Sequence, residues 1–406
     1  MKVGLFISRA GREGAICAFD LVRFVRSLGE EMALYCPGLD PASDASLWVR
    51  FDRSDWTSPG WWARARLDLA IFYGITGFPA EVLRAARQSG ATVVVEGDTD
   101  GRVSPAQNLP ERLASHWDSR TSWGHRLRAA KAGLDLWLWR RGAIEREVLA
   151  CLGEADFIKV ESTAPAAILK EFLRSRGRPE LADRVVEIPF AVRECFTELP
   201  VPEGKEDTVV IAGRLGEIQK GPLETVEAIR ELLIRDPGVR IEVHLRGELT
   251  AEFAALAAGS PRLRICENTT REQLAERLRG AAVLFSRSRW ETTPVIALEA
   301  LCSGCTLVAP EGLPGYRSLI EGERFGRTYP GRSTRAAVEA ILTELGHWRA
   351  GRRDGTAIAR HWRARASLRI VAGQLLELRA SPSPAEAHFQ AHPSAGRPAG
   401  QSIANP

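Results

Sequence analysis

The sequence lacks several features that would place it in a special class of protein. No apolar run approaches the roughly 18 residues of a membrane-spanning helix, and the apolar core of the first segment is too short for a signal peptide. The 55 basic and 51 acidic side chains leave a net charge of only +4, with no block of like charge that resembles a nucleic-acid-binding arm. We therefore expect a cytoplasmic protein that has no nucleic-acid partner.

Cysteine is also too sparse and scattered to build a framework. The seven cysteines are odd in number and lie in different predicted strands and helices, as is typical of a reducing compartment. Cys302 and Cys305 have the spacing of a zinc pair, but no second pair lies nearby. We interpret them as small packing residues and predict no metal site.

The chain is too long for a single core, and its pattern predicts two domains. Short apolar segments alternate with helical segments in both halves, which is typical of doubly wound α/β sheets with parallel strands. We predict an N-terminal Rossmann-like domain at 1–190, a second one at 191–356, a helix crossing back at 357–380, and a disordered tail at 381–406. Strands are expected near residues 2–8, 32–36, 68–73, 91–96, 157–160, 185–189, 208–213, 239–245, 262–266, 282–286 and 306–309.

Two carboxylates lie eight positions apart in the second half. Glu291 follows the predicted strand 282–286, and Glu299 falls on the next helix, with Pro294 placed in its first turn. Ligands bind at the carboxyl ends of strands in open α/β sheets. Carboxylates at such an edge suit sugar hydroxyls, whereas the alternative is an ordinary loop glutamate and helix glutamate.

Two cations occupy another strand edge in the same half. Gly213-Arg214 ends the predicted strand 208–213, and Lys220-Gly221 precedes a helix that begins near Leu223. Only six of the 55 Lys and Arg residues are lysines, so Lys220 is conspicuous. A planar guanidinium and an ammonium next to glycines predict a site for a diphosphate.

The combination of these motifs resembles a known family. Gly213-Arg214, Lys220-Gly221 and the pair Glu291 and Glu299 together are similar to the donor half of retaining GT-B glycosyltransferases of the family 4 type, the glycosyl transferases group 1. The resemblance covers roughly residues 150 to 345 well and the first 150 loosely. It implies two Rossmann-like domains that face a cleft.

The resemblance also implies a role for each residue. Arg214 and Lys220 would hold the donor pyrophosphate, Glu299 would accept hydrogen bonds from the ribose, and Glu291 would face the transferred sugar. The backbone of Gly213 and of the segment Thr292, Thr293 and Pro294 would also contact the donor, and Gly14 would allow close approach from the opposite domain. The reaction would need no cofactor, because the nucleotide sugar is a substrate.

The first half carries weaker signals. Gly11 and Gly14 lie in a short predicted loop between the first strand and a helix expected to begin at Ala15, but they do not form a dinucleotide-binding fingerprint. Asp98 and Asp100 follow the predicted strand 91–96 and could hold a divalent cation, as in GT-A enzymes, or form a polar turn. We favour the turn and select Asp98 as an acceptor-side residue.

A basic, aromatic segment follows at Trp123 to Leu152. Such a helix could lie on an anionic membrane surface, or its apolar residues could pack on the domain while its arginines are solvated. We favour the second interpretation and leave association with the inner face of the membrane open. Residues 101–125 are expected to form an acceptor-side loop.

The sequence thus predicts a metal-independent glycosyltransferase that uses a nucleotide sugar. Family frequency favours a UDP-sugar, and the acceptor would be a hydroxyl of a lipid, a polysaccharide or a small molecule. A phosphorylase-type enzyme of the same architecture and a non-catalytic glycosyltransferase-like subunit stay open as alternatives. The sequence indicates neither the linkage nor the oligomeric state.

Overall fold

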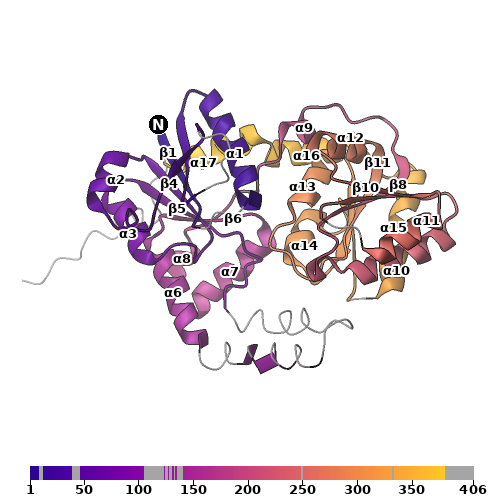
Figure 1. Cartoon of the computed structure of the whole chain (residues 1–406), viewed down its shortest axis with the longest axis horizontal. Helices are drawn as coiled ribbons and strands as arrows, with labels where there is room; N and C mark the ends of the chain where they lie inside the picture. The colour runs from indigo at the N-terminus through magenta and orange to yellow at the C-terminus, as the bar shows by residue number, and fades with distance from the viewer. Residues whose placement is uncertain are drawn as a thin grey trace, which may run out of the picture.

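The protein consists of two lobes, each built on a parallel β-sheet that is covered by helices (Figure 1). The computed structural model describes residues 1–8, 12–38, 46–104, 140–247, 250–331 and 333–379, together with residues 123, 127, 130–131 and 133–134. The side chains of residues 12–17 and 218 lie outside this description. The predicted tail at 381–406 and most of the loop at 101–125 also lie outside it.

The N-terminal lobe contains a seven-stranded sheet in the order β3-β2-β1-β4-β5-β6-β7. Every neighbouring pair is parallel. The strand order reverses between β1 and β4, which creates a crevice at the carboxyl ends of these strands. The strands are β1 (Lys2–Phe6), β2 (Glu31–Cys36), β3 (Trp48–Arg50), β4 (Leu69–Tyr73), β5 (Thr92–Glu96), β6 (Phe157–Val160) and β7 (Val185–Glu187).

The C-terminal lobe contains a six-stranded parallel sheet in the order β10-β9-β8-β11-β12-β13. Its order reverses between β8 and β11, so the second crevice lies beyond the ends of these two strands. The strands are β8 (Glu206–Gly213), β9 (Arg240–Leu245), β10 (Leu263–Glu267), β11 (Ala281–Phe285), β12 (Thr306–Pro310) and β13 (Gly326–Tyr329).

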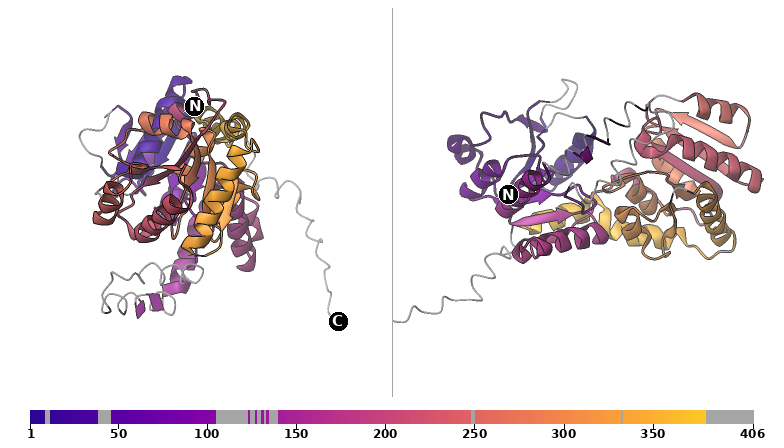
Figure 2. Two further views of the ribbon diagram at one scale, coloured as in Figure 1. Left: turned by 90° about the vertical axis from the view of Figure 1, so that its right-hand side faces the viewer. Right: turned by 90° about the horizontal axis from the view of Figure 1, so that it is seen from below.

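Helices cover both faces of each sheet (Figures 1 and 2). Those of the first half are α1 (Arg12–Ser27), α2 (Pro59–Ala65), α3 (Ala80–Gln88), α6 (Arg141–Glu154), α7 (Thr163–Ser175) and α8 (Pro179–Ala182). Those of the second half are α9 (Glu194–Thr197), the 3-10 turn η2 (Ile218–Lys220), α10 (Pro222–Arg235), α11 (Ala251–Ala258), α12 (Arg271–Gly280), α13 (Val295–Cys302), α14 (Pro314–Ile320), α15 (Thr334–Arg349), α16 (Gly355–Ala366) and α17 (Leu368–Glu377).

The last helix of the chain packs on the first lobe. Leu368, Val371 and Leu375 of α17 are buried in the same core as residues of β1, β2 and α1. Figure 1 shows α17 beside α1 although they come from opposite ends of the sequence. Burial of these side chains contributes on the order of 1.5–3 kcal/mol each, so α17 ties the two halves of the chain together.

The lobes also touch across the cleft. The Thr292 hydroxyl donates to Asp98 Oδ1 at 2.9 Å, and the backbone N–H of Ala164 donates to Ser318 Oγ at 2.8 Å. Helices α7 and α14, which carry the second pair, pack against each other. The crevices of the two lobes are therefore held close together.

Two predicted helix boundaries are wrong. The segment predicted as one helix at 357–380 is divided, because Ser367 adopts extended backbone and forms a bridge with Val192 of the linker between the lobes. The first helix begins at Arg12 rather than Ala15. The sheets also contain β3 and β13, which were not predicted because they are short and lie at sheet edges.

The N-terminal caps of α12 and α13 each differ by one residue from what the sequence pattern indicates. Thr269 and Glu272 match the sequence pattern of a capping box, but Thr270 caps α12, with Gln273 returning the hydrogen bond to its backbone. The Thr269 hydroxyl instead faces the His244 ring at 3.0 Å. Pro294 is the N-cap of α13 rather than a residue of its first turn. Both Thr269 with Glu272 and Thr270 with Gln273 have the spacing of a capping box, and tertiary contacts select the second pair.

Candidate active site

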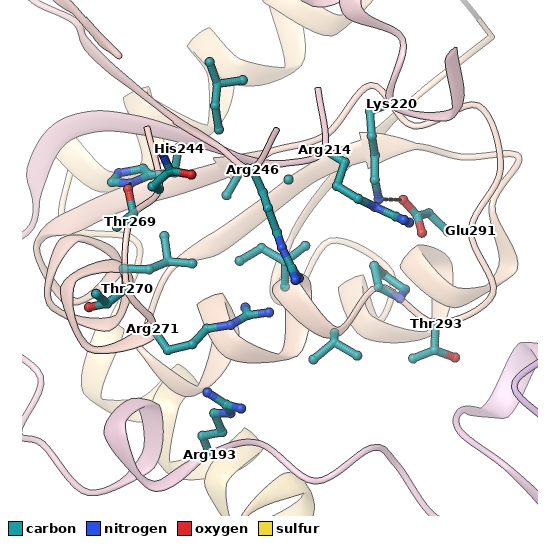
Figure 3. A pocket seen from close by; sticks show the side chains of 18 residues that line it. Arg193, Arg214, Lys220, His244, Arg246, Thr269, Thr270, Arg271, Glu291 and Thr293 are labelled. Carbon is teal, nitrogen blue, oxygen red and sulfur yellow. Dashed lines mark hydrogen bonds and ion pairs between the residues drawn. The ribbon is translucent and has the colours of Figure 1, made fainter. Parts of the chain in front are cut away.

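A cavity of about 590 Å³ opens at the crevice of the C-terminal lobe. It lies beyond the carboxyl ends of β8, β9 and β10 and at the N-terminal ends of α12 and α13. Figure 3 shows that guanidinium groups from separate elements extend into it. Its lining includes six of the predicted residues, namely Gly213, Arg214, Lys220, Glu291, Thr293 and Pro294.

Two glycines allow the cationic loop to fold. Gly213 has a φ of 142° and Gly221 a φ of 59°, conformations that other residues rarely adopt. A Cβ on Gly221 would lie 2.7 Å from the carbonyl oxygen of Arg287, so the backbone of the loop after β11 already fills that space. These turns return the chain so that Lys220 and Arg214 line the same wall of the cavity.

Glu291 is bound directly to Lys220. One carboxylate oxygen, Oε1, accepts a short hydrogen bond from Lys220 Nζ and a second from Ser288 Oγ, the latter at 2.7 Å. Glu291 is buried and Lys220 nearly so. The pair therefore holds a positive and a negative charge at the wall of the cavity, where low exposure strengthens their attraction.

Gln219 joins the two loops that carry this pair. Its backbone carbonyl accepts from the Arg289 N–H at 2.7 Å, and its side-chain amide donates to the Trp290 carbonyl at 2.9 Å and to Glu291 Oε2 at 3.4 Å. The Arg289 guanidinium extends to Glu224 of α10 at 2.6 Å. The loops after β8 and β11 thus form one connected unit.

Glu299 reaches the cavity through another residue. Its side chain is 2% exposed, and both carboxylate oxygens accept from Arg271 Nη1 at 3.1 and 3.0 Å. Burial raises the pKa of Glu299 to about 7, and the charge of Arg271 opposes that shift. Arg271 lines the cavity and is partly exposed, whereas Glu299 is not part of the lining. The carboxylate lies directly behind the Arg271 guanidinium.

The remaining donor-side residues lie at the junction of the lobes. Thr293 is buried and lines both the first cavity and a second, smaller one. Thr292 contacts Asp98, whose other oxygen accepts from Tyr73 Oη at 2.8 Å. Asp98 has a left-handed φ of 38°, a strained conformation for a residue with a side chain. Asp98 therefore faces the donor-side loop.

Gly14 was placed in a loop, and the structure corrects that assignment. It lies inside α1, which begins at Arg12. Its surroundings belong to the side chains that the structure does not describe, so its predicted role stays a prediction. His116, His125, Trp137 and Trp139 also lie outside the described residues.

The acidic turn after β5 is engaged within the protein. Asp100 Oδ1 accepts from the Arg102 N–H at 3.0 Å, and burial raises the pKa of Asp100. Within the described ranges, no three His, Cys, Asp or Glu side chains gather closely enough to hold a metal ion. Cys302 and Cys305 are fully buried, and Cys305 Sγ donates to the Leu278 carbonyl at 2.8 Å. In the same part of the chain, no helix is long and apolar enough to cross a bilayer.

The cavity is also lined by cationic and polar residues that were not predicted from the sequence. These are Arg193, His244, Arg246, Asn268 and Arg271. Arg246 and Asn268 directly follow β9 and β10, so the strand-end rule that selected Arg214 would also have selected them. Arg193 lies in the linker and forms an ion pair with Asp20 of α1 at 2.5 Å. No local sequence signal points to this linker residue.

Comparison with known proteins agrees with this geometry. Residues 206–347 match the family model of glycosyl transferases group 1, which is the segment that forms the C-terminal lobe. No protein of curated function matches the chain in sequence.

Solved structures with little sequence identity share the whole fold. Sucrose-phosphate synthase from Thermosynechococcus elongatus has a TM-score of 0.61 at 16% identity, covering 97% of this chain and 100% of that one. A glycosyltransferase from Rickettsia africae has a TM-score of 0.63 at 13% identity, covering 93% and 97%. Anabaena HepE, solved with UDP, has a TM-score of 0.59 at 14% identity, covering 94% and 100%.

These similarities confirm the predicted fold class. Two Rossmann-like domains with parallel sheets form a GT-B architecture, and the second carries the match to glycosyl transferases group 1. The prediction of a glycosyltransferase-type enzyme is supported at this level of family and fold.

Proposed function

We propose that the protein is a retaining glycosyltransferase of the family 4 type, which moves a sugar from a nucleotide sugar to an acceptor hydroxyl without a metal ion. The observation that carries this proposal is the convergence of Arg214, Lys220 and Glu291 on one cavity at the crevice of the C-terminal lobe. That cavity lies in the segment that matches glycosyl transferases group 1.

The donor diphosphate would bind against Arg214 and Lys220. Breaking the anomeric bond places growing negative charge on the leaving phosphate, and preorganised cations stabilise that charge. The hydrogen bond to Glu291 orients Lys220 at the wall of the cavity, where its ammonium could contact a phosphate oxygen. Because side chains supply this charge, we propose a metal-independent reaction.

The sugar would lie toward Glu291 and the backbone of Thr292 and Thr293. In the reaction, the acceptor oxygen forms a bond to the anomeric carbon while the bond from that carbon to the phosphate oxygen breaks. The leaving diphosphate takes the electron pair and accepts the hydroxyl proton. Attack from the same face as the leaving group retains the configuration, and this stereochemistry rests on the family resemblance.

Glu299 would act on the ribose together with Arg271. The carboxylate is held by Arg271, which faces the cavity, so ribose hydroxyls would either meet the guanidinium or replace it at Glu299. UDP is the first nucleotide to test, since the similar Anabaena protein was solved with UDP. The acceptor would be a lipid, polysaccharide or small-molecule hydroxyl, and the enzyme would act in the cytoplasm or at the inner face of the membrane.

A nucleotide screen followed by turnover tests the proposal. Thermal shifts with UDP, GDP, ADP and dTDP should single out one nucleoside diphosphate. A nucleotide sugar with that nucleoside diphosphate should then be hydrolysed slowly or donate its sugar to an acceptor. The rate should be unchanged in EDTA, and NMR should show that the anomeric configuration is retained. A protein that binds none of the four nucleotides would contradict the proposal.

The same assays separate the alternatives. A phosphorylase-type enzyme would consume or release inorganic phosphate in proportion to turnover. A non-catalytic subunit would bind the nucleotide and turn over neither the donor alone nor any donor and acceptor pair.

A further inference from the structure

A second cavity of about 300 Å³ adjoins the first one. Arg214, Thr293 and Val295 line both cavities. A molecule in the second cavity would therefore lie next to the donor sugar. The inference below rests on the proposed function, since it concerns the partner of that donor.

The walls of this cavity are mainly apolar, and they come from distant parts of the chain. Leu21 projects from α1, Phe190 from the linker, and Val371 and Leu375 from α17. Their surfaces favour an apolar ring or a short chain over an extended, fully hydroxylated glycan. The volume is at the low end for ligand sites, which indicates a ligand of one or two rings.

A polar cluster forms the end of the cavity at the edge of the N-terminal sheet. Lys159 is 1% exposed, and its Nζ lies 2.5 Å from Glu96 Oε1 and 4.7 Å from the centre of the Phe190 ring. Glu96 itself borders the cavity. A buried carboxylate that is neutralised by a lysine is suited to accept a hydrogen bond from a neutral hydroxyl.

Charged side chains of both signs line the cavity, and Glu161 lies behind Lys159. The cations Lys159 and Arg214 and the anions Glu96 and Asp98 form its charged lining. The Asp98 oxygens already accept from two hydroxyl groups, those of Tyr73 and Thr292. The oxygens of both lining carboxylates are already engaged within the protein, Glu96 by Lys159 and Asp98 by two hydroxyl groups, and an anionic ligand would meet both carboxylates. The lining thus favours a neutral ligand.

We propose that this second cavity binds the acceptor as a small neutral molecule with an apolar body and a hydroxyl group. Glu96 accepts a hydrogen bond from a hydroxyl of the bound acceptor, and Leu21, Phe190 and Leu375 enclose its apolar part. Helix α17 then serves the acceptor site as well as the junction between the two halves of the chain.

Four matched probes test the chemistry of the ligand. Calorimetry on the full chain, saturated with UDP, compares phenyl glucoside with methyl glucoside, phenyl glucuronide and phenyl glucosaminide. The expected result is that phenyl glucoside binds at least about tenfold more tightly than the other three. Equal binding of methyl glucoside, or tighter binding of either charged probe, would overturn the proposal.

Substitutions in the wall test the location. Leu375→Trp and Leu21→Trp would fill the cavity and should weaken phenyl glucoside about tenfold or more while leaving UDP affinity unchanged. The matched control is Ile370→Trp on the same helix, because Ile370 is 36% exposed and lies outside the lining. Unchanged phenyl glucoside affinity in a filled variant that still binds UDP would refute the site.

Binding data on the wild type distinguish a failure of the acceptor proposal from a failure of the proposed function. Wild-type protein that binds UDP but not phenyl glucoside would refute only the acceptor proposal. Wild-type protein that binds neither phenyl glucoside nor any of UDP, GDP, ADP and dTDP would also refute the proposed function. If one filled variant loses UDP binding through misfolding, the other variant and the ranking of probes on the wild type decide the question.

Discussion

The two lobes use charged residues in opposite ways. In the C-terminal lobe, Arg214 and Lys220 line an open cavity and have exposed or partly exposed side chains. In the N-terminal lobe, Lys159 is completely buried between Glu96 and Glu161. The first arrangement suits an anionic ligand that arrives from solution, and the second fixes Glu96 at a sheet edge that borders the second cavity. The comparison shows that a cation in a loop after a strand can stay accessible to solvent, whereas a cation within a strand is buried with its counter-ions.

The largest expected effect is a loss of stability when the buried lysine of the N-terminal lobe is replaced. Lys159→Met would leave Glu96 and Glu161 buried without their cation, and breaking a buried pair costs about 3–5 kcal/mol. Chemical denaturation should show this loss, whereas Lys170→Met on the surface of α7 should stay within about 0.5 kcal/mol of the wild type. A loss below about 1 kcal/mol for Lys159→Met would show that the cluster is not structural.

The converse experiment removes a binding cation. Lys220→Ala should lower turnover of the donor by roughly 100- to 1000-fold, as is typical when one stabilising group is lost. Its free energy of unfolding should also fall, because Glu291 loses its cation, but by less than the loss of about 3–5 kcal/mol expected for a fully buried pair, since both side chains border an open cavity. Steady-state kinetics and denaturation on one preparation give both values. Unimpaired turnover would remove Lys220 from the proposed mechanism.

A buried carboxyl in the C-terminal lobe should give a pH dependence. Burial raises the pKa of Glu299 to about 7. Between the pKa of this carboxyl in the unfolded chain, 4.5, and its pKa of about 7 in the folded protein, the folded state binds more protons than the unfolded state. The free energy of unfolding therefore falls as pH rises from the first value to the second.

Glu299→Gln should flatten this part of the stability curve. Relative to the wild type, the variant should gain up to about 3 kcal/mol between pH 4.5 and pH 7. Glu161, whose pKa burial also raises to about 7, keeps its own contribution in the variant and supplies an internal control. A difference between variant and wild type that does not change with pH would mean that Glu299 is ionised throughout.

The smallest effect concerns the contact between the lobes. Thr292→Val removes the hydrogen bond to Asp98 while keeping the side-chain shape, and should cost about 0.5–1.5 kcal/mol of stability. Thr343→Val is the matched control, because the exposed Thr343 hydroxyl donates only to a carbonyl of its own helix, that of Glu339. Equal effects of both substitutions would indicate that the contact does not hold the lobes together.

The sequence predicted the C-terminal site better than the N-terminal one for a physical reason. Arg214, Lys220 and Glu291 lie in short polar loops next to predicted strands, so their position at a sheet edge follows from local pattern alone. Lys159 lies inside the apolar segment Phe157–Val160, and periodicity does not reveal what it pairs with. Its partners come from β5 and from the residue after β6.

Long-range contacts also explain the errors in the fold. The bridge between Val192 and Ser367 divides the predicted terminal helix, and no signal within residues 357–378 predicts it. The ion pair of Glu299 with Arg271 likewise joins two helices, α13 and α12, whose paired residues are distant in sequence. Element types followed from local pattern, whereas the pairing of side chains across the fold did not.

Isothermal titration of UDP into the wild type, Arg214→Ala and Arg240→Ala tests the central claim most directly. Arg240 is a matched control because its exposed side chain pairs with Glu206 at the opposite end of the same sheet. The account predicts that Arg240→Ala binds like the wild type and that Arg214→Ala binds at least about tenfold more weakly. Equal affinity in all three proteins would contradict a diphosphate site in this cavity.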